Sequence, residues 1–135
     1  MKWFLDLNVL LDVIQQRPPF FETSAQVLSR VVRGEVTGHI AGHELTTAHY
    51  IVKRYTDHRA ADDLVDWLLV HFEIVAESEA TFRRARALEW NDFEDAVIAS
   101  AAEETGCDFV VTRNIKDFAN SPVPAITPVD LLGLD

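Results

Sequence analysis

The sequence predicts an α/β fold in which a short, mostly parallel central sheet has helices on both faces. Short apolar runs rich in β-branched and aromatic residues recur along the chain, and segments with helical spacing separate them. Acidic or polar residues follow several of these runs. Strands that alternate with helices pair in parallel, and such sheets bind ligands beyond the carboxyl ends of their strands.

The first half of the chain follows this alternation from its start. Trp3-Phe4-Leu5 is expected to be a short buried strand, and Asn8 is placed to cap a helix that runs to about Gln15. Gly34 is expected to end the helix that precedes it. The further elements predicted here are a helix over 22–32, a strand over 35–41, and helices over 43–55 and 58–70.

The second half continues the pattern. Asp92 can cap a helix over 93–105 that Gly106 ends, and small residues after Asp95 should let this helix lie close to the sheet. The remaining predicted elements are a strand over 73–75, a helix over 79–88, strands over 109–111 and 125–126, and a small terminal helix.

Composition sets the class of protein. A chain of 135 residues with 48% hydrophobic residues predicts one folded domain over 1–135. The single cysteine, Cys107, excludes an intramolecular disulfide and a thiolate zinc site. The chain reaches Asp6 too early for a signal peptide, and its apolar runs fall short of the ~20 residues that cross a membrane. We therefore expect a cytoplasmic protein without a membrane partner.

The formal net charge of −10 argues against binding nucleic acid through a basic surface. It does not exclude an enzyme whose acids are gathered around a metal ion. The basic clusters at 53–54 and 83–86 are interpreted as solvated helix faces. Arg113 and Lys116 differ, because they lie beside a candidate site acid.

Four acids are the candidate catalytic and metal-binding residues: Asp6, Glu44, Asp95 and Asp117. Asp6 ends a buried strand, where Asn8 already offers the helix cap, so a functional role is favoured. Glu44 and Asp95 begin helices, where the macrodipole favours an acid without any further duty. Asp117 ends a polar loop after a buried strand, where it can also serve a turn. Taken together, the four predict one acidic site.

Other polar residues have supporting or competing roles. Asp92 shares a helix face with Asp95, and capping competes with a role in the site. Asp12 is interpreted as structural or supporting. Thr112 and Asn114 belong to the polar loop that contains Asp117, and Asn114 can orient a carboxylate or a water. The five histidines show no ligand spacing and are predicted to be incidental: His39, His43, His49, His58 and His71.

Carboxylates without histidine or cysteine partners suit a hard, oxygen-seeking ion, Mg²⁺ or Mn²⁺. Such an ion activates a water and neutralises a phosphate, which are the requirements of phosphodiester hydrolysis. Without metal, the acids would raise one another's pKa values and repel a nucleic acid.

At these residues the chain resembles the PIN-domain family of metal-dependent ribonucleases, and most closely its bacterial branch of VapC-type toxins. The matching segments occur in the family's order and span nearly the whole chain: 5–12 (LDLNVLLD), 44–47 (ELTT), 92–96 (DFEDA) and 112–118 (TRNIKDF). Each segment alone is weak evidence, and the ordered set is strong. One position departs from the family, because Leu7 stands where a serine or threonine is usual.

The resemblance implies a three-layer α/β/α fold and Mg²⁺-dependent cleavage of RNA. It implies metal ligation by Asp6 and Asp95, with Glu44 and Asp117 completing the acidic pocket. Asn8 and Asn114 match positions that support the site by hydrogen bonding. It further implies a homodimer and an antitoxin protein that holds the enzyme inactive.

Two other functions remain open on the sequence. A haloacid-dehalogenase-like phosphohydrolase also has an aspartate after its first strand, but it needs a second one at the position that Asn8 occupies. A catalytically inactive PIN-like binding module fits the low pI of about 4.8, although the complete set of acids speaks against it.

Overall fold

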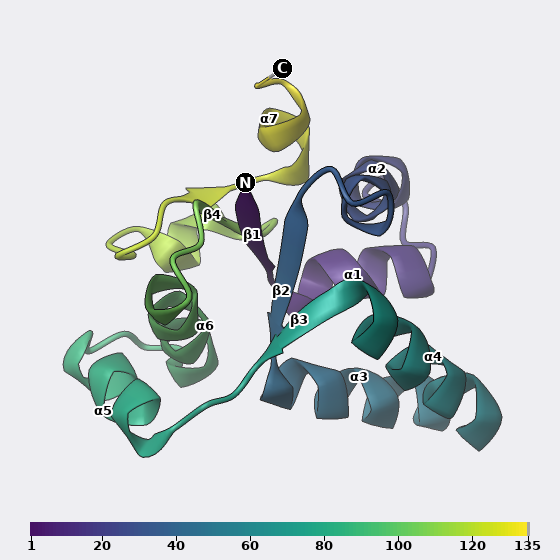
Figure 1. Ribbon diagram of the computed structural model, residues 1–135, viewed down its shortest axis with the longest axis horizontal. Helices are drawn as coiled ribbons and strands as arrows, with labels where there is room; N and C mark the ends of the chain where they lie inside the picture. The colour runs from purple at the N-terminus through teal and green to yellow at the C-terminus, as the bar shows by residue number, and fades with distance from the viewer. Residues whose placement is uncertain (135) are drawn as a thin grey trace.

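The computed structural model describes residues 1–134, which form one five-stranded sheet flanked by helices (Figure 1). Every strand pair is parallel, and the spatial order is β3-β2-β1-β4-β5. The strands are β1 (Lys2–Leu5), β2 (Thr37–Ala41), β3 (Phe72–Val75), β4 (Phe109–Val111) and β5 (Ala125–Ile126). The predicted α/β class is confirmed, with a sheet that is parallel throughout.

The helices cover both faces of this sheet. In Figure 1, α5 and α6 lie on one side, and α1 to α4 lie on the other. Their bounds are α1 (Leu7–Ile14), α2 (Phe21–Val32), α3 (Gly42–Tyr55), α4 (His58–His71), α5 (Glu79–Ala87), α6 (Phe93–Glu104) and α7 (Pro128–Leu132), with a 3₁₀ helix η1 (Ile115–Phe118) after β4. The structure therefore has three layers.

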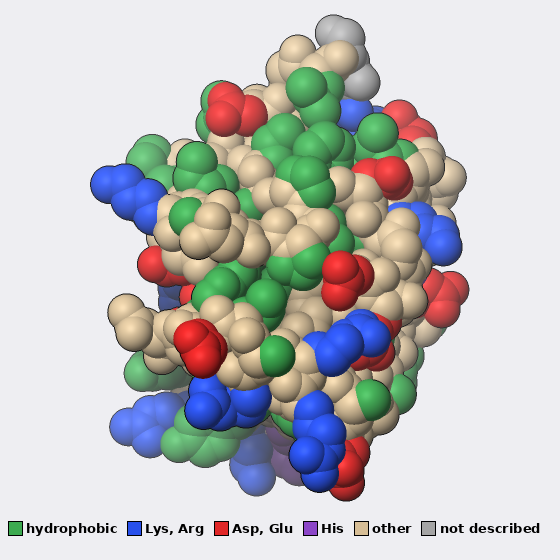
Figure 2. Space-filling view, turned by 90° about the vertical axis from the view of Figure 1, so that its left-hand side faces the viewer, with side chains coloured by type: hydrophobic (Ala, Val, Ile, Leu, Met, Phe, Trp, Pro, Cys, Tyr) green, Lys and Arg blue, Asp and Glu red, His purple; other side chains and the backbone are tan. Residues whose placement is uncertain are grey.

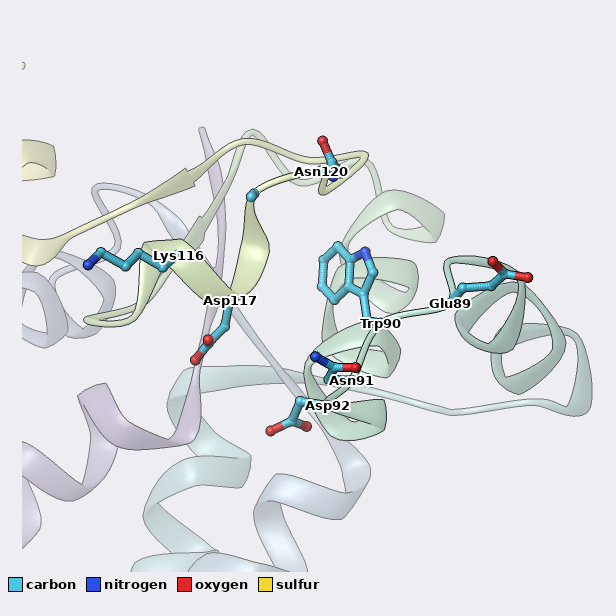
Figure 3. A pocket seen from close by; sticks show the side chains of 8 residues that line it. Glu89, Trp90, Asn91, Asp92, Lys116, Asp117 and Asn120 are labelled. Carbon is cyan, nitrogen blue, oxygen red and sulfur yellow. The ribbon is translucent and has the colours of Figure 1, made fainter.

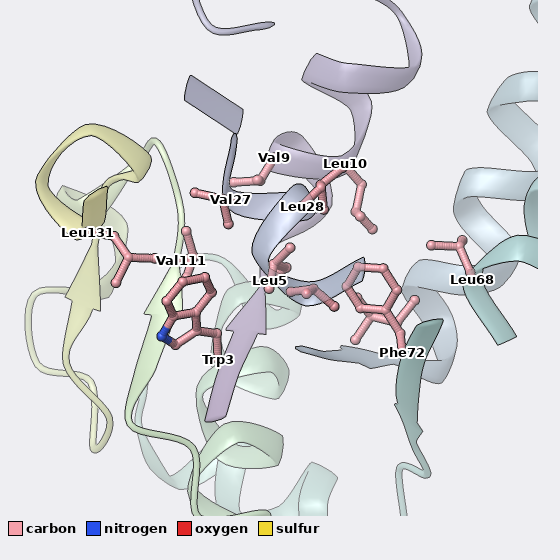
Figure 4. Close-up of a cluster of buried hydrophobic side chains, with 12 residues drawn as sticks. Trp3, Leu5, Val9, Leu10, Val27, Leu28, Leu68, Phe72, Val111 and Leu131 are labelled. Carbon is pink, nitrogen blue, oxygen red and sulfur yellow. The ribbon is translucent and has the colours of Figure 1, made fainter. Parts of the chain in front are cut away.

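Strand β1 is the centre of the sheet because its side chains are apolar on both faces. Trp3 and Leu5 belong to the core cluster beneath α1, α2 and α4, which Figure 4 shows. Phe4 belongs to the opposite cluster, where it packs with the alanines of α6. Alternate residues of a strand face opposite sides. This run of apolar residues thus fixes β1 between two helical layers and places its carboxyl end at the middle of the sheet edge.

Helix α6 lies close to the sheet, as its small residues predict. Its residues 96–102 are all buried. Gly106, which follows this helix, has a φ of +68°, and Gly34, which follows α2, has a φ of +76°. Both are in the left-handed region that favours glycine after a helix, so both predicted stops are confirmed.

Two sequence predictions about element ends are wrong. Asn8 is not a helix cap, because α1 begins at Leu7 and Asp6 occupies the N-cap position. The second strand begins at Thr37 rather than at residue 35, because Gly34 and Glu35 still belong to the turn that follows α2. The first of these corrections bears directly on the site.

The basic residues at 83–86 lie on a solvated helix face, as predicted. Arg83 pairs with Glu79 one turn away, and both side chains are exposed. Figure 2 shows lysine and arginine side chains gathered in the lower part of the molecular face that includes α5. Within residues 1–134, no helix has the length and apolarity that a membrane span requires.

Candidate metal centre

The topology gathers polar residues at one edge of the sheet, because all strands run in the same direction. Asp6 directly follows β1, and Thr112 directly follows β4. Glu44 lies in the first turn of α3, which directly follows β2. Glu77 comes two residues after the end of β3. The carboxyl edge of the sheet is thus the acidic edge, as parallel pairing requires.

Asp6 holds the centre of this edge. It is in the N-cap position of α1, but within the described residues its side chain makes no N-cap hydrogen bond. Its Oδ2 accepts hydrogen bonds from Thr112 Oγ1 at 2.8 Å and Asn8 Nδ2 at 3.2 Å. Burial raises the pKa of Asp6, and the Thr112 hydrogen bond partly opposes that rise. The carboxylate is therefore oriented by neighbours rather than used for capping.

Thr112 itself is fixed by the loop that follows β4. Its side chain is fully buried, and its Oγ1 accepts a hydrogen bond from the backbone N–H of Asn114 at 3.1 Å. Asn114 thus supports Asp6 through Thr112, by its backbone rather than its side-chain amide. Leu7, which stands where the PIN family usually has serine or threonine, has no hydroxyl to offer Asp6. The Thr112 hydroxyl donates a hydrogen bond to Asp6 instead.

Glu44 is the most buried acid of the site, with no exposed surface. Its Oε1 accepts a hydrogen bond from the backbone N–H of Ala41 at 2.8 Å. Its Oε2 has no hydrogen-bond partner among the described residues. Burial raises the pKa of Glu44 well above its usual value, and the charge of Asp6 adds to that rise. A buried, charged carboxylate with an unpartnered oxygen beside a second acid is costly unless a proton or a cation neutralises it.

Asp95 and Asp92 lie at the start of α6. Asp92 accepts a hydrogen bond from the backbone N–H of Asp95 at 3.1 Å. Asp92 therefore caps the helix, which is the alternative role that the sequence predicts for it. Asp95 is partly buried. Burial first, and then the negative charge of Asp6, raise the pKa of Asp95 to about 7. The electrostatic coupling joins Asp95 to Asp6 across two elements that are far apart in the sequence.

Asp117 lies in η1 and is exposed. Its charge is among the causes that raise the pKa of Asp95, so it faces the same acidic space. With Asp92 it lines a cleft of about 310 Å³ that also includes Trp90, Asn91 and Asn120. Figure 3 shows the carboxylates of Asp92 and Asp117 pointing to the same side of this cleft. Asp117 therefore joins the acidic edge at its solvent-facing rim.

Two acids of this edge escape the sequence prediction. Glu77 accepts hydrogen bonds from the backbone N–H and ring Nδ1 of His43, both at 2.7 Å. The charges of Glu77 and Glu94 are further causes of the raised pKa of Glu44. Glu77 follows the end of β3 closely, and that position could have identified it from the sequence. No comparable feature of the sequence identifies Glu94 as a residue of this edge.

Asp12 is structural, as one of its two interpretations predicts. It is fully buried and pairs with Arg113 Nε at 2.8 Å, and it accepts a hydrogen bond from Ser24 Oγ. This ion pair fastens the loop after β4 to α1. Arg113, which follows Thr112 in the sequence, therefore fixes the loop that carries Thr112 next to Asp6.

The structure contains one histidine cluster that spacing along the sequence does not reveal. His49 and His58 converge on Asp62, and the potential ligand atoms of the three residues lie within 4.8 Å of one another. The sequence separation hid this cluster, because packing of α3 against α4 brings the two histidines together. The cluster involves none of the four candidate acids.

The residues at the acidic edge fit a divalent ion. Asp6, Glu44 and Asp95 offer only oxygen ligands, and none of the three forms an ion pair with another described residue. The buried Oε2 of Glu44 lacks a partner, and burial together with like charge raises the pKa values of all three acids. A hard cation would bind the unpartnered oxygen of Glu44, and its positive charge would lower the pKa values of the three acids.

Comparison with solved structures supports the same fold. A chain of VapBC2 from Rickettsia felis, bound to a promoter DNA fragment, matches with a TM-score of 0.73 and 21% identity over 94% of this chain and 98% of that chain. A toxin–antitoxin complex from Klebsiella pneumoniae matches with a TM-score of 0.71 and 24% identity, over 93% and 96% of the two chains. VapC20 from Mycobacterium tuberculosis, described as a sarcin-ricin loop cleaving toxin, matches with a TM-score of 0.65 and 14% identity. The match covers 80% of this chain and 86% of that chain.

At these identities the likeness establishes the fold, which is the fold found in structures of VapC toxins. A comparison with curated protein sequences returns no match. The PIN domain family, by contrast, matches residues 2–116, which is most of the chain and includes Asp6, Glu44 and Asp95. With its parallel sheet and acidic edge, this chain belongs to the PIN-domain family.

Proposed function

We propose that this protein is an endoribonuclease that depends on Mg²⁺ or Mn²⁺, with Asp6, Glu44, Asp95 and Asp117 as its acidic site. The observation that carries the proposal is that burial raises the pKa values of Asp6, Glu44 and Asp95, and that the charge of Asp6 further raises those of Glu44 and Asp95. Asp6 follows β1, Glu44 lies at the start of the helix after β2, and Asp95 lies at the start of α6. Perturbed carboxyl groups at a sheet crevice are typical of catalytic sites.

Asp6, Glu44 and Asp95 would hold the ion, with Asp117 at the rim. A divalent ion bound there supplies a water of lowered pKa and charge neutralisation for a phosphate. The protein's own contribution is orientation, because Thr112 and Asn8 fix Oδ2 of Asp6. Asp92 caps α6 and so fixes the helical turn that carries Asp95.

The cleft beside the acids supports a single-stranded substrate. Trp90 lines it and offers a ring on which a base can stack, while Asn91 and Asn120 offer amides that can bond a base edge or a phosphate. Lys116 adds a positive charge to the lining of a protein whose net charge is −10. RNA is the substrate class that the PIN resemblance favours.

The proposal extends to a toxin held inactive by an antitoxin. Support comes from two protein complexes, VapBC2 and a toxin–antitoxin complex, each of which contains a chain with this fold. Helices α3 and α4 also expose large apolar side chains, which a partner or a second copy of the chain could cover: Tyr50, Tyr55, Leu69 and Val70. A homodimer is part of the same proposal.

Neither alternative function is favoured by a specific observation. A phosphohydrolase of the haloacid-dehalogenase type needs an acid where Asn8 stands, and the Asn8 amide instead donates a hydrogen bond to Asp6. An inactive binding module has no need of a buried Glu44 with an unpartnered oxygen.

Cleavage of a mixed-sequence, fluorophore-quenched RNA tests the enzyme. Wild-type protein would be assayed with Mn²⁺, with Mg²⁺ and with chelator, beside Asp6→Asn and the matched surface variant Asp66→Asn. We expect metal-dependent cleavage by wild type and Asp66→Asn alone. Equal cleavage by Asp6→Asn would contradict the assignment, and a DNA strand of the same sequence tests the restriction to RNA.

A growth assay tests the toxin. Induced wild-type protein should arrest growth, and Asp6→Asn should not. If a small open reading frame lies beside the gene, its co-expression should relieve the arrest. Cleavage in vitro without growth arrest would retain the nuclease and reject the toxin. Light scattering of the purified chain reports on the homodimer.

A further inference from the structure

A cluster of metal-ligating side chains lies away from the acidic edge, on the helical hairpin formed by α3 and α4. His49 Nε2 lies 2.8 Å from Oδ1 of Asp62, and His58 Nε2 lies 3.2 Å from Oδ2 of the same carboxylate. The two imidazole rings meet edge to face with centroids 5.9 Å apart. One carboxylate thus lies between two imidazole nitrogens that come from different helices.

The hairpin brings these residues together. His58 and Asp62 are one turn apart on α4, so their side chains share a face. His49 reaches the same face from α3, which is joined to α4 by residues 56–57. Asp57 caps α4 by accepting a hydrogen bond from the backbone N–H of Ala60, which fixes the start of the helix that carries His58.

We propose that His49, His58 and Asp62 form a second metal site, selective for Zn²⁺ or a similar transition ion such as Co²⁺ or Ni²⁺. Imidazole nitrogens suit these ions, whereas the all-oxygen acidic edge suits Mg²⁺ or Mn²⁺. Two histidines and one carboxylate provide three ligands of a tetrahedral site, and a water or a partner's side chain completes it.

The present spacing needs only small side-chain movements to close on an ion. Zinc–nitrogen and zinc–oxygen bonds of about 2 Å separate tetrahedral ligand atoms by roughly 3.3 Å. The three potential ligand atoms are already within 4.8 Å of one another. The side chains of His58 and Asp62 are 65% and 53% exposed, so they are free to rotate, and the less exposed His49 gives the site a fixed side.

A His–Asp hydrogen-bond cluster without metal is the competing account of the same contacts. The positive charge of Lys53, which acts on Asp62, opposes a cation there. The two accounts differ in what they expect of the hairpin. A bound ion would link α3 to α4 and stabilise the folded state, because it binds the folded chain and not the separated helices.

Titration of the full-length protein with Co²⁺ tests the proposal, in a large excess of Mg²⁺ that competes at the acidic edge. The visible absorption of Co²⁺ becomes much stronger when the ion passes from six-coordinate in water to a tetrahedral site, so it reports binding there. We expect a saturable signal at one equivalent, displaced by Zn²⁺, and a higher melting temperature with Zn²⁺. His58→Ala and Asp62→Asn should lose both effects, while Asp63→Asn, the adjacent exposed acid on α4, should keep them.

Three results would overturn the proposal. The first is no saturable Co²⁺ binding by the wild type, and the second is Co²⁺ binding that His58→Ala leaves unchanged. The third is a signal lost in Asp6→Asn but kept in Asp62→Asn, which would assign the ion to the acidic edge. Since His58 is exposed, its replacement leaves the core intact, and circular dichroism of the variant verifies its fold.

Discussion

The hydroxyl of Thr112 donates a 2.8 Å hydrogen bond to Oδ2 of Asp6 and so joins the ends of two neighbouring strands. Leu5 of β1 is in register with Val111 of β4, which makes Asp6 and Thr112 the next residues of the two strands. The central carboxylate of the site is therefore held both by the register of the sheet and by Asn8 in the first turn of α1.

Replacement of Thr112 by valine should weaken metal binding and cleavage. Valine keeps the shape but removes the donor, so the carboxylate of Asp6 loses its shortest hydrogen bond and the backbone N–H of Asn114 loses its acceptor. Loss of a group that orients a ligand typically costs about 10–100-fold in metal affinity or activity. Calorimetric titration with Mn²⁺ measures the change. Thr112→Ser keeps the hydroxyl and should stay close to wild type; an equal loss in both variants would assign the effect to packing.

Glu44→Gln should stabilise the metal-free protein near neutral pH and abolish its stabilisation by metal. The amide keeps an acceptor for the Ala41 N–H but removes a buried acid whose pKa is raised by burial and by Asp6. We expect a gain of roughly 1–3 kcal/mol in unfolding free energy in chelator. Urea unfolding with and without Mg²⁺ measures both effects. Glu103→Gln, an exposed change on α6, is the control; a destabilised, metal-responsive Glu44→Gln would contradict the account.

Stability of the metal-free protein should fall as pH rises from about 4 to about 7. In the folded state the pKa of Asp95 is raised from 3.8 to about 7, and those of Asp6 and Glu44 are also raised. The unfolded chain therefore releases its protons first as pH rises, and the unfolding free energy declines across that window. Urea unfolding in chelator at several pH values measures the slope. Asp95→Asn should flatten it, and a slope of the opposite sign would show that these acids are not the dominant titrating groups.

Arg113→Met should destabilise the fold by about 3–5 kcal/mol, because it leaves the fully buried Asp12 without its ion-pair partner. Cleavage should also fall, since Arg113 holds the loop that carries Thr112 and Asn114. Thermal and urea unfolding measure the loss. Arg83→Met breaks an exposed ion pair on α5 and should change stability little. Equal losses of stability in Arg113→Met and Arg83→Met would mean that the buried ion pair contributes no more to folding than the exposed one.

The sequence predicts most of the fold because apolar runs and helical spacing are local signals. It also locates Asp6, since a residue that ends the central buried strand must lie at the sheet edge. The sequence assigns the cap of α1 to Asn8, because asparagine is a favoured N-cap residue. In the structure the helix already begins at Leu7, before Asn8, and the Asn8 amide donates a local hydrogen bond to the carboxylate of Asp6.

The parts that escape prediction depend on packing between elements. His49 and Asp62 are 13 positions apart and meet only because α3 packs against α4. Burial of Asp12 beside Arg113 joins residues 101 positions apart. Similarly, Glu44 with its unpartnered oxygen lies at the start of α3, which packs against α1, β2 and β3, and no spacing along the chain encodes this packing.

The most direct test of the central claim is calorimetric titration of the purified protein with Mn²⁺. Wild type, Asp6→Asn, Asp95→Asn and the control His49→Ala would be titrated under identical conditions. The account predicts saturable binding by wild type and His49→Ala, and loss of that binding in both aspartate variants, because Asp6 and Asp95 belong to one site at the end of β1. Undiminished binding by both aspartate variants, or no binding by wild type, would contradict it.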